Sequence, residues 1–163
     1  GSAGVASNQN VGDLVAQLVD NYEPLLEGRD LELTVTHSAD LNVIAPEAVI
    51  AVVLGNLLGN AIRYTPSGEV RIEIETGRVR IVDTGPGIAA DELPHVFDRH
   101  FRGRDADGKG SGLGLSIVKR LCDLYGWSIR FENRDQGSGL AVTVDFFPDL
   151  DVIEHRADEP AAV

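Results

Sequence analysis

The sequence predicts an α+β fold, a two-layer sandwich in which helices cover a mixed, mostly antiparallel sheet. Two adjacent runs, EVRIEIE and RVRIVD, alternate apolar and polar residues and are separated only by Thr76–Gly77, so we expect a hairpin. The amphipathic helical stretches lie elsewhere in the chain, and this segregation of helices from paired strands is typical of α+β domains. At 163 residues the chain has the length of a single domain.

The remaining elements are predicted from apolar periodicity and from glycine and proline at the boundaries. Helical spacing occurs over residues 11–26, 46–64 and 114–125, and in a short stretch near 91–97. Strand-like alternation occurs in LELTV over 31–35, in WSIRFEN and in LAVTVDFF, with a polar loop over 102–111. We therefore expect one domain over 11–148, preceded by a tag-cleavage remnant or linker over 1–10 and followed by an acidic, flexible tail over 149–163.

Composition excludes several classes of function. The formal net charge of -12 disfavours contact with nucleic acid or anionic lipid, because phosphate groups attract a basic surface. No apolar run reaches the roughly 18 residues of a transmembrane helix. The lone Cys122 lies in the apolar stretch LCDLYG, where we expect a buried structural thiol, and no cysteine or histidine cluster has metal-ligand spacing.

The helix AVVLGNLLGNAIRYT carries the first candidate site. At about 100° per residue, one arc contains Asn56, Asn60, Arg63 and Tyr64, and the opposite side is apolar, with Val53, Leu57, Leu58 and Ala61. Gly55 and Gly59 flank the arc and leave room beside the backbone. Asparagine and glycine in mid-helix cost stability, and a plain solvated face, which is the alternative, would be expected to carry glutamate, lysine or glutamine. The asparagines therefore favour a binding role. A neutral carboxamide oxygen suits Mg²⁺ that already sits among phosphates.

Two glycine-rich segments follow. In VDTGPGI, the carboxylate of Asp83 can accept a hydrogen bond from an exocyclic amine such as that of adenine, although an ordinary loop is the alternative. In GKGSGLGLSIVKRL, over 108–121, glycines directly precede a helix, so that free N–H groups and the helix dipole face anions. A flexible linker is the alternative there, and the spacing is that of neither a P-loop nor a dinucleotide-binding fingerprint.

In this order the segments resemble the GHKL ATPase superfamily and, within it, the sensor histidine kinases. NLLGNAIRYT matches the asparagine box, VDTGPGI the first glycine box, VFDRHFRG the phenylalanine box and GKGSGLGLSIV the second glycine box. The resemblance covers about residues 11–148. It implies the Bergerat ATP-binding fold, with ATP and Mg²⁺ as cofactors.

The resemblance also implies a role for each matching residue. Asn60 would hold Mg²⁺ that bridges the ATP phosphates, with Asn56 close to the same site. Arg63 would face phosphate and Tyr64 would lie near the nucleotide. Asp83 would accept the adenine amino group and select adenine over guanine.

Further matching residues would enclose the nucleotide. The adenine pocket would be shaped by Gly85, Gly87 and Ile88. The start of a mobile ATP lid would be anchored by Phe97 and Phe101, with Arg102 near the phosphates. The second glycine box would close over the triphosphate with Lys109, Gly110, Ser111, Gly112, Leu113 and Gly114.

Two positions depart from the superfamily pattern. Asn56 stands where the hydrolysing relatives place a glutamate general base, and this fits a kinase that retains ATP; no residue is assigned as a catalytic acid or base. Leu140 stands where the family usually places threonine, which puts one secondary adenine contact in doubt.

None of the four histidines has the sequence context of a phosphoacceptor. His37, His95, His100 and His155 lack the following acidic residue and proline, so we expect the dimerisation helices upstream of Gly1. The chain alone would then be the catalytic fragment of a protein-histidine kinase, inactive in autophosphorylation on its own. Its partners would be its own phosphoacceptor domain, in a homodimer, and a response regulator, and it would be the cytoplasmic part of a protein anchored in the bacterial inner membrane. The alternatives are a serine kinase of the anti-sigma type and a non-catalytic nucleotide-binding module.

Overall fold

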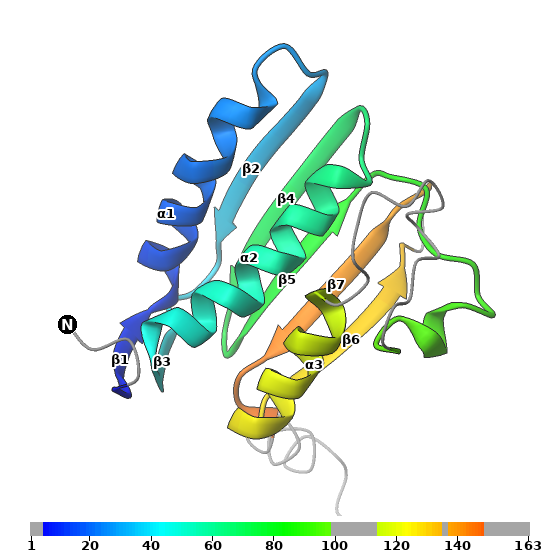
Figure 1. Cartoon of the computed structure of the whole chain (residues 1–163). Coiled ribbons are helices and arrows are strands. Elements are labelled where there is room, and N and C mark those ends of the chain that lie inside the picture. Colours follow the sequence, from blue (N-terminus) through cyan, green and yellow to red (C-terminus); the bar gives the residue numbers. More distant parts are fainter. Residues whose placement is uncertain (1–4, 99–113, 135–136, 149–163) are drawn as a thin grey trace, which may run out of the picture.

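The computed structural model describes residues 5–98, 114–134 and 137–148. Within them, a five-stranded sheet in the order β2-β4-β5-β7-β6 carries three α-helices on one face (Figure 1). The strands are β2 (Leu31–His37), β4 (Gly68–Glu75), β5 (Arg78–Asp83), β6 (Ser128–Asn133) and β7 (Leu140–Asp145). The helices are α1 (Val11–Tyr22), α2 (Glu47–Arg63) and α3 (Gly114–Tyr125). The predicted two-layer α+β architecture is confirmed.

The sheet is mixed because one of its strand pairs is parallel. β2 runs parallel to β4, with Leu31 opposite Gly68, and α2 lies between these two strands in the chain. The hairpin predicted at Thr76–Gly77 joins β4 and β5, with Glu75 opposite Arg78. β7 then pairs antiparallel with both β5 and β6.

The N-terminal segment differs from the prediction. Residues expected in a remnant or linker form β1 (Ser7–Asn10), which pairs antiparallel with β3 (Asn42–Ala45), a strand that was not predicted. SNQN has no apolar alternation, so its strand depends on backbone pairing to a distant segment. The side chain of Asn10 then caps α1 by accepting a hydrogen bond from the N–H of Asp13 at 3.0 Å.

Two predicted helical stretches are shorter than expected because of proline. The helix over 11–26 divides into α1 and a 3₁₀ turn, η1 (Glu23–Leu26), and Pro24 lies in the first turn of η1. The short helix near 91–97 is a 3₁₀ turn, η2 (Leu93–His95), which contains Pro94. Proline lacks the N–H that an α-helix interior needs and its ring clashes with the preceding turn.

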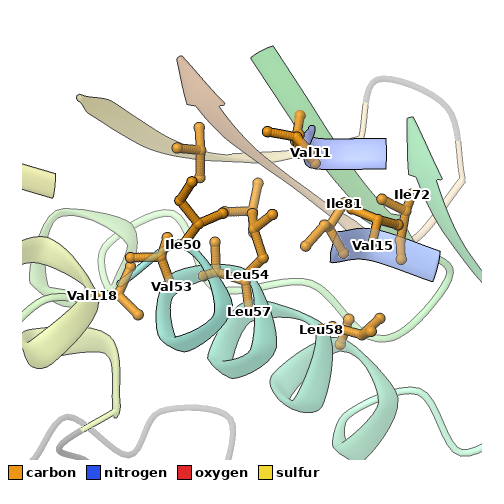
Figure 2. Packing of buried hydrophobic residues seen from close by; sticks show 14 of the residues in the cluster. Val11, Val15, Ile50, Val53, Leu54, Leu57, Leu58, Ile72, Ile81 and Val118 are labelled. Carbon is orange, nitrogen blue, oxygen red and sulfur yellow. The ribbon is translucent and has the colours of Figure 1, made fainter. Parts of the chain in front are cut away.

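The core lies between α2 and the sheet, flanked by α1 and α3. Figure 2 shows its packing, with labelled side chains from all three helices and the sheet: Val11, Val15, Ile50, Val53, Leu54, Leu57, Leu58, Ile72, Ile81 and Val118. The apolar face predicted for α2 is buried as expected. Each such side chain stabilises the fold by roughly 1.5–3 kcal/mol relative to exposure. Burial of this face leaves the polar arc of α2 on the other side.

Cys122 belongs to this core. It is fully buried on α3, and desolvation raises the pKa of its thiol to about 11. The thiol therefore stays protonated at neutral pH, as expected for a structural cysteine. No helix in the described ranges is long and apolar enough to cross a membrane.

Candidate functional site

The candidate site lies at one end of the sheet. The C-terminal end of α2, the end of β5 and the start of β7 meet there (Figure 1). Asp83 is the last residue of β5 and pairs with Leu140, the first residue of β7. Three segments that are far apart in the sequence are thus brought together.

Asp83 is held rigidly although it is almost completely buried. The residue is only 2% exposed. Its Oδ1 accepts hydrogen bonds from the N–H of Gly85 at 3.0 Å and from the N–H of Leu140 at 3.3 Å. A buried carboxylate is costly unless such bonds compensate for lost hydration. The two bonds therefore place the carboxylate at a defined position between β5 and β7.

The turn after β5 packs directly on the end of α2. A Cβ added to Gly85 would lie 2.6 Å from the carbonyl oxygen of Tyr64 and 3.1 Å from Thr65 Oγ1, so no larger residue fits. Thr65 is fully buried, and its hydroxyl has no hydrogen-bond partner among the described residues. An orphaned buried hydroxyl costs about 1–3 kcal/mol. Such a group beside Asp83 fits a site that receives a ligand atom or a water.

The far end of the same turn is attached to β6. Ile88 is buried, and its N–H donates to Oδ1 of Asn133 at 2.9 Å while its carbonyl accepts from Nδ2 of Asn133 at 2.6 Å. Gly87 has φ of 73°, and a Cβ there would lie 2.6 Å from Asn133 Oδ1. Sequence reasoning missed Asn133, because nothing local distinguishes an asparagine at the end of a strand.

The polar arc of α2 borders a hollow of about 270 Å³. Three of the predicted residues line it, Asn56, Asn60 and Arg63, together with Ala51, Val52, Gly55, Gly59 and Tyr22 of α1. Tyr64 caps α2, with the guanidinium carbon of Arg63 5.7 Å from the centre of its ring. The structure thus gathers the two asparagines and the arginine around one hollow that is lined by α1 and α2.

The start of α3 contacts the first of these carboxamides. A Cβ on Gly114 would lie 3.1 Å from Oδ1 of Asn56, and Nδ2 of Asn56 donates to the Val52 carbonyl at 2.7 Å. The amide group of Asn56 is therefore oriented with its oxygen towards α3. Anions are favoured near a helix N-terminus, so a phosphate beside Asn56 would be stabilised there.

Gly59 and Tyr22 explain how closely α1 packs on α2. A Cβ on Gly59 would lie 2.8 Å from the Tyr22 hydroxyl oxygen, and that hydroxyl donates to the Gly55 carbonyl at 3.2 Å. The room that these glycines leave beside the α2 backbone is thus taken partly by a phenol.

Gly59→Ala is expected to displace the Tyr22 hydroxyl and break its hydrogen bond to the Gly55 carbonyl. The loss of that bond, about 0.5–1.5 kcal/mol, should offset the better helix propensity of alanine, so that the free energy of unfolding does not rise. In Tyr22→Phe the clashing oxygen is gone and the next ring atom is at 3.6 Å, an ordinary contact. In the Tyr22→Phe background, Gly59→Ala should therefore raise the free energy of unfolding by up to about 1 kcal/mol in urea unfolding, because only the helix propensity remains. Strictly additive effects of the two changes would contradict this packing.

The phenylalanine box is described only in part. Phe97 packs edge-on against Phe131 of β6, with ring centres 5.2 Å apart, and Lys119 Nζ of α3 is 6.0 Å from the centre of the Phe97 ring. Phe97 thereby ties the segment after η2 to the sheet. The remaining predicted residues lie outside the described residues, as does the predicted lid: Phe101, Arg102, Lys109, Gly110, Ser111, Gly112 and Leu113.

The donor set fits Mg²⁺ that arrives with phosphates. Within the described ranges, no group of three or more histidine, cysteine or acidic side chains is placed to hold a metal ion. Asn56 and Asn60, which line the hollow, instead carry neutral carboxamide oxygens. Mg²⁺ keeps several waters and is commonly bound through one or two protein oxygens plus substrate phosphates, which matches this sparse set.

Comparison with known proteins identifies the family. Residues 46–151 match the model described as histidine kinase-, DNA gyrase B- and HSP90-like ATPase. The chain belongs to this ATPase family. The resemblance predicted from the four sequence boxes is thereby confirmed.

Within this ATPase family the chain is similar to sensor kinases. It is 40% identical over 145 residues to the sensor protein kinase PmrB of Pseudomonas aeruginosa, covering 85% of this chain and 30% of PmrB. It is 34% identical over 143 residues to the sensor histidine kinase CusS of Escherichia coli, covering 83% of this chain and 30% of CusS. The chain thus spans less than a third of these relatives.

Solved structures show which part it matches. The mycobacterial sensor histidine kinase MprB superposes with a TM-score of 0.73 and 28% identity, covering 85% of this chain and 95% of that chain. The catalytic domain of histidine kinase ThkA superposes with a TM-score of 0.73 and 27% identity, covering 85% of this chain and 93% of that chain. The chain corresponds to the ATP-binding catalytic domain of sensor histidine kinases.

Proposed function

We propose that the chain binds Mg·ATP and donates the γ-phosphate to a histidine on a separate dimerisation domain, for relay to a response regulator. The observation that supports this most directly is the buried carboxylate of Asp83 at the end of β5, which accepts two backbone hydrogen bonds. The hollow lined by Asn56, Asn60 and Arg63 of α2 adds to this support. In the full-length protein we infer a homodimer anchored in the inner membrane, with this domain in the cytoplasm.

Adenine would be selected at the end of β5. The Asp83 carboxylate accepts hydrogen bonds and cannot donate them when ionised, so it favours the exocyclic amine of adenine over the carbonyl of guanine. Gly85 and Gly87 have no side chain, so the backbone of the turn itself would form one wall of the adenine pocket. The buried Ile88 would provide an apolar contact next to that wall. Because the carboxylate is already fixed, little ordering is needed when the base binds.

The phosphates would lie along the polar arc of α2. Asn60, with Asn56 one turn earlier, would supply metal ligands, and Arg63 a permanent positive charge beside Tyr64. Mg²⁺, when bound, neutralises charge on the phosphate oxygens. The residues around it would orient the γ-phosphate for in-line attack. We propose that Arg102 and the segment from Lys109 to Gly114 close over the triphosphate, with Phe97 and Phe101 at the start of the lid.

Transfer to histidine needs no base from this chain, because a neutral imidazole nitrogen is itself the nucleophile. The amide of Asn56 does not take a proton near neutral pH, so activation of water is not favoured and ATP is retained. Of the two histidines in the described ranges, His37 ends β2 and His95 lies in η2, paired with Asp98 at 3.0 Å. Neither lies on an α-helix such as carries a phosphoacceptor in this family.

Incubation with γ-labelled ATP tests the proposal. The chain alone is expected to bind ATP and acquire no label, whereas a helical dimerisation domain added in cis or in trans should acquire label that acid removes. Acid-labile label on the isolated chain would assign the acceptor to one of its own histidines. Acid-stable label on a partner would instead favour a serine kinase, and binding without any transfer would favour a non-catalytic module.

A further inference from the structure

We propose that Asn133 is a positioning residue for the nucleotide, because its side chain fixes the turn that forms the wall of the adenine pocket. The inference rests on the proposed function. It adds a residue on β6, outside the asparagine, phenylalanine and glycine boxes. Asn133 would not touch the nucleotide itself and would act through the backbone of Ile88.

The carboxamide of Asn133 pairs with the backbone of Ile88 through two hydrogen bonds, as a residue of a neighbouring strand would. It accepts a hydrogen bond from the Ile88 N–H at 2.9 Å and donates one to the Ile88 carbonyl at 2.6 Å. Only asparagine and glutamine present an acceptor and a donor in one plane at this spacing, and glutamine is longer by one methylene. The side chain thus satisfies both polar groups of one backbone residue in a turn that has no strand partner there.

The other attachments of this turn lie at its beginning. The N–H of Thr84 donates to the Glu69 carbonyl at 3.1 Å, and the N–H of Gly85 donates to Asp83 at 3.0 Å. Pro86, which follows, has no N–H to offer. Asn133 therefore holds the far end of a turn whose near end is already fixed.

The position of this far end matters for the base. Gly87 sits against Asn133 Oδ1 with no room for a side chain, and the buried Ile88 packs into the core next to it. Without the two hydrogen bonds, residues 86–88 can shift away from β6, while Asp83 stays in place through Leu140. The carboxylate and the apolar wall would then no longer have the spacing that the base requires.

Because Asn133 is exposed, the effect of its side chain on nucleotide binding can be measured separately from its effect on folding. Asn133 is solvent-exposed as a residue, and its strand pairing with Leu140 uses the backbone, so truncation of its side chain opens no cavity. Asn133→Ala is therefore expected to leave the far-UV spectrum of the nucleotide-free chain unchanged. Its thermal unfolding midpoint should fall by only a few degrees, through the backbone groups of Ile88 that lose their partners. Its matched control is Glu132→Ala, the preceding exposed residue of β6, which pairs with Arg130 instead of the turn.

Calorimetry and amide exchange on the whole chain test the proposal. Asn133→Ala should weaken ATP, ADP and adenosine by the same factor, about 5- to 10-fold, because only the base wall has moved. Exchange of the Ile88 amide should accelerate in the nucleotide-free variant, and Glu132→Ala should change neither quantity.

Two results would overturn the positioning role. One is wild-type affinity in Asn133→Ala. The other is a loss of affinity that comes with loss of the folded far-UV spectrum or leaves Ile88 exchange unaltered. Failure of the unmodified chain to bind any adenine nucleotide would instead overturn the proposed function, so the two failures are distinguishable.

Discussion

Asp83→Asn is expected to weaken ATP binding at least ~10-fold while the domain stays folded. Asparagine retains an oxygen that can accept from the N–H groups of Gly85 and Leu140, so the local structure survives. Its amide nitrogen, however, presents a donor to the exocyclic amine of adenine, which is also a donor. The variant should also lose most of its preference for ATP over GTP, because the guanine carbonyl can accept from the new amide.

Calorimetry with ATP and GTP measures both effects. The matched control is Asp145→Asn, which changes another buried carboxylate at the opposite end of β7, where Oδ1 accepts from the Phe147 N–H at 2.9 Å. That control should bind ATP as the wild type does. Asp83→Ala is less informative, since it also deletes the two bonds to the backbone and so destabilises the turn. Equal affinity of wild type and Asp83→Asn for ATP would remove Asp83 from the adenine site.

Asn60→Ala is expected to reduce phosphotransfer to an added helical domain by at least about 100-fold. Removal of the carboxamide would withdraw the proposed ligand oxygen of Asn60, so that Mg²⁺ and the phosphates would be held loosely. The adenine site proposed at Asp83 uses a separate set of contacts, so adenine binding should be partly retained. The readout is therefore a large loss of labelled product together with a smaller loss of nucleotide affinity.

Two controls sharpen this experiment. Asn21→Ala removes an exposed asparagine from α1 and should leave both quantities unchanged. Affinity for ATP in the presence of excess chelator should be similar in wild type and Asn60→Ala, because the difference between them depends on the metal. Undiminished transfer by Asn60→Ala, or an equally large defect without metal, would show that Asn60 does not act through Mg²⁺.

The parts of the fold that could be predicted depend on neighbours in the sequence. The buried face of α2 follows from a local period, since Val53 and Leu57 recur at helical spacing whatever lies beyond them. The β4–β5 hairpin likewise needs only two alternating runs and Gly77, which adopts φ of 73°. Helix ends were less well predicted, because Pro24 lies within the apolar period and ends the α-helix without interrupting that pattern.

The parts that could not be predicted depend on contacts between distant segments. β1 has a polar sequence and exists through its pairing with β3, about 35 residues away by register. Asn133 meets Ile88 only because β6 lies next to β7 and β7 next to β5. Motif matching indicated Asp83 and the α2 asparagines, since their spacing is fixed within one element. It could not indicate which residue of another strand holds the turn between them.

The position of Leu140 late in the sequence determines when the site can be completed during synthesis of the chain. The carboxylate of Asp83 is held in part by the first residue of the last strand of the sheet, and Asn133 belongs to the strand before it. A ribosome releases the chain from its N-terminus, so α1, α2 and the β4–β5 hairpin emerge well before either residue. A nascent chain would therefore carry the asparagines and Asp83 for several seconds without a finished base pocket. If Asp83 holds the base as proposed, nucleotide can bind to the nascent domain and stabilise it only after β7 has emerged.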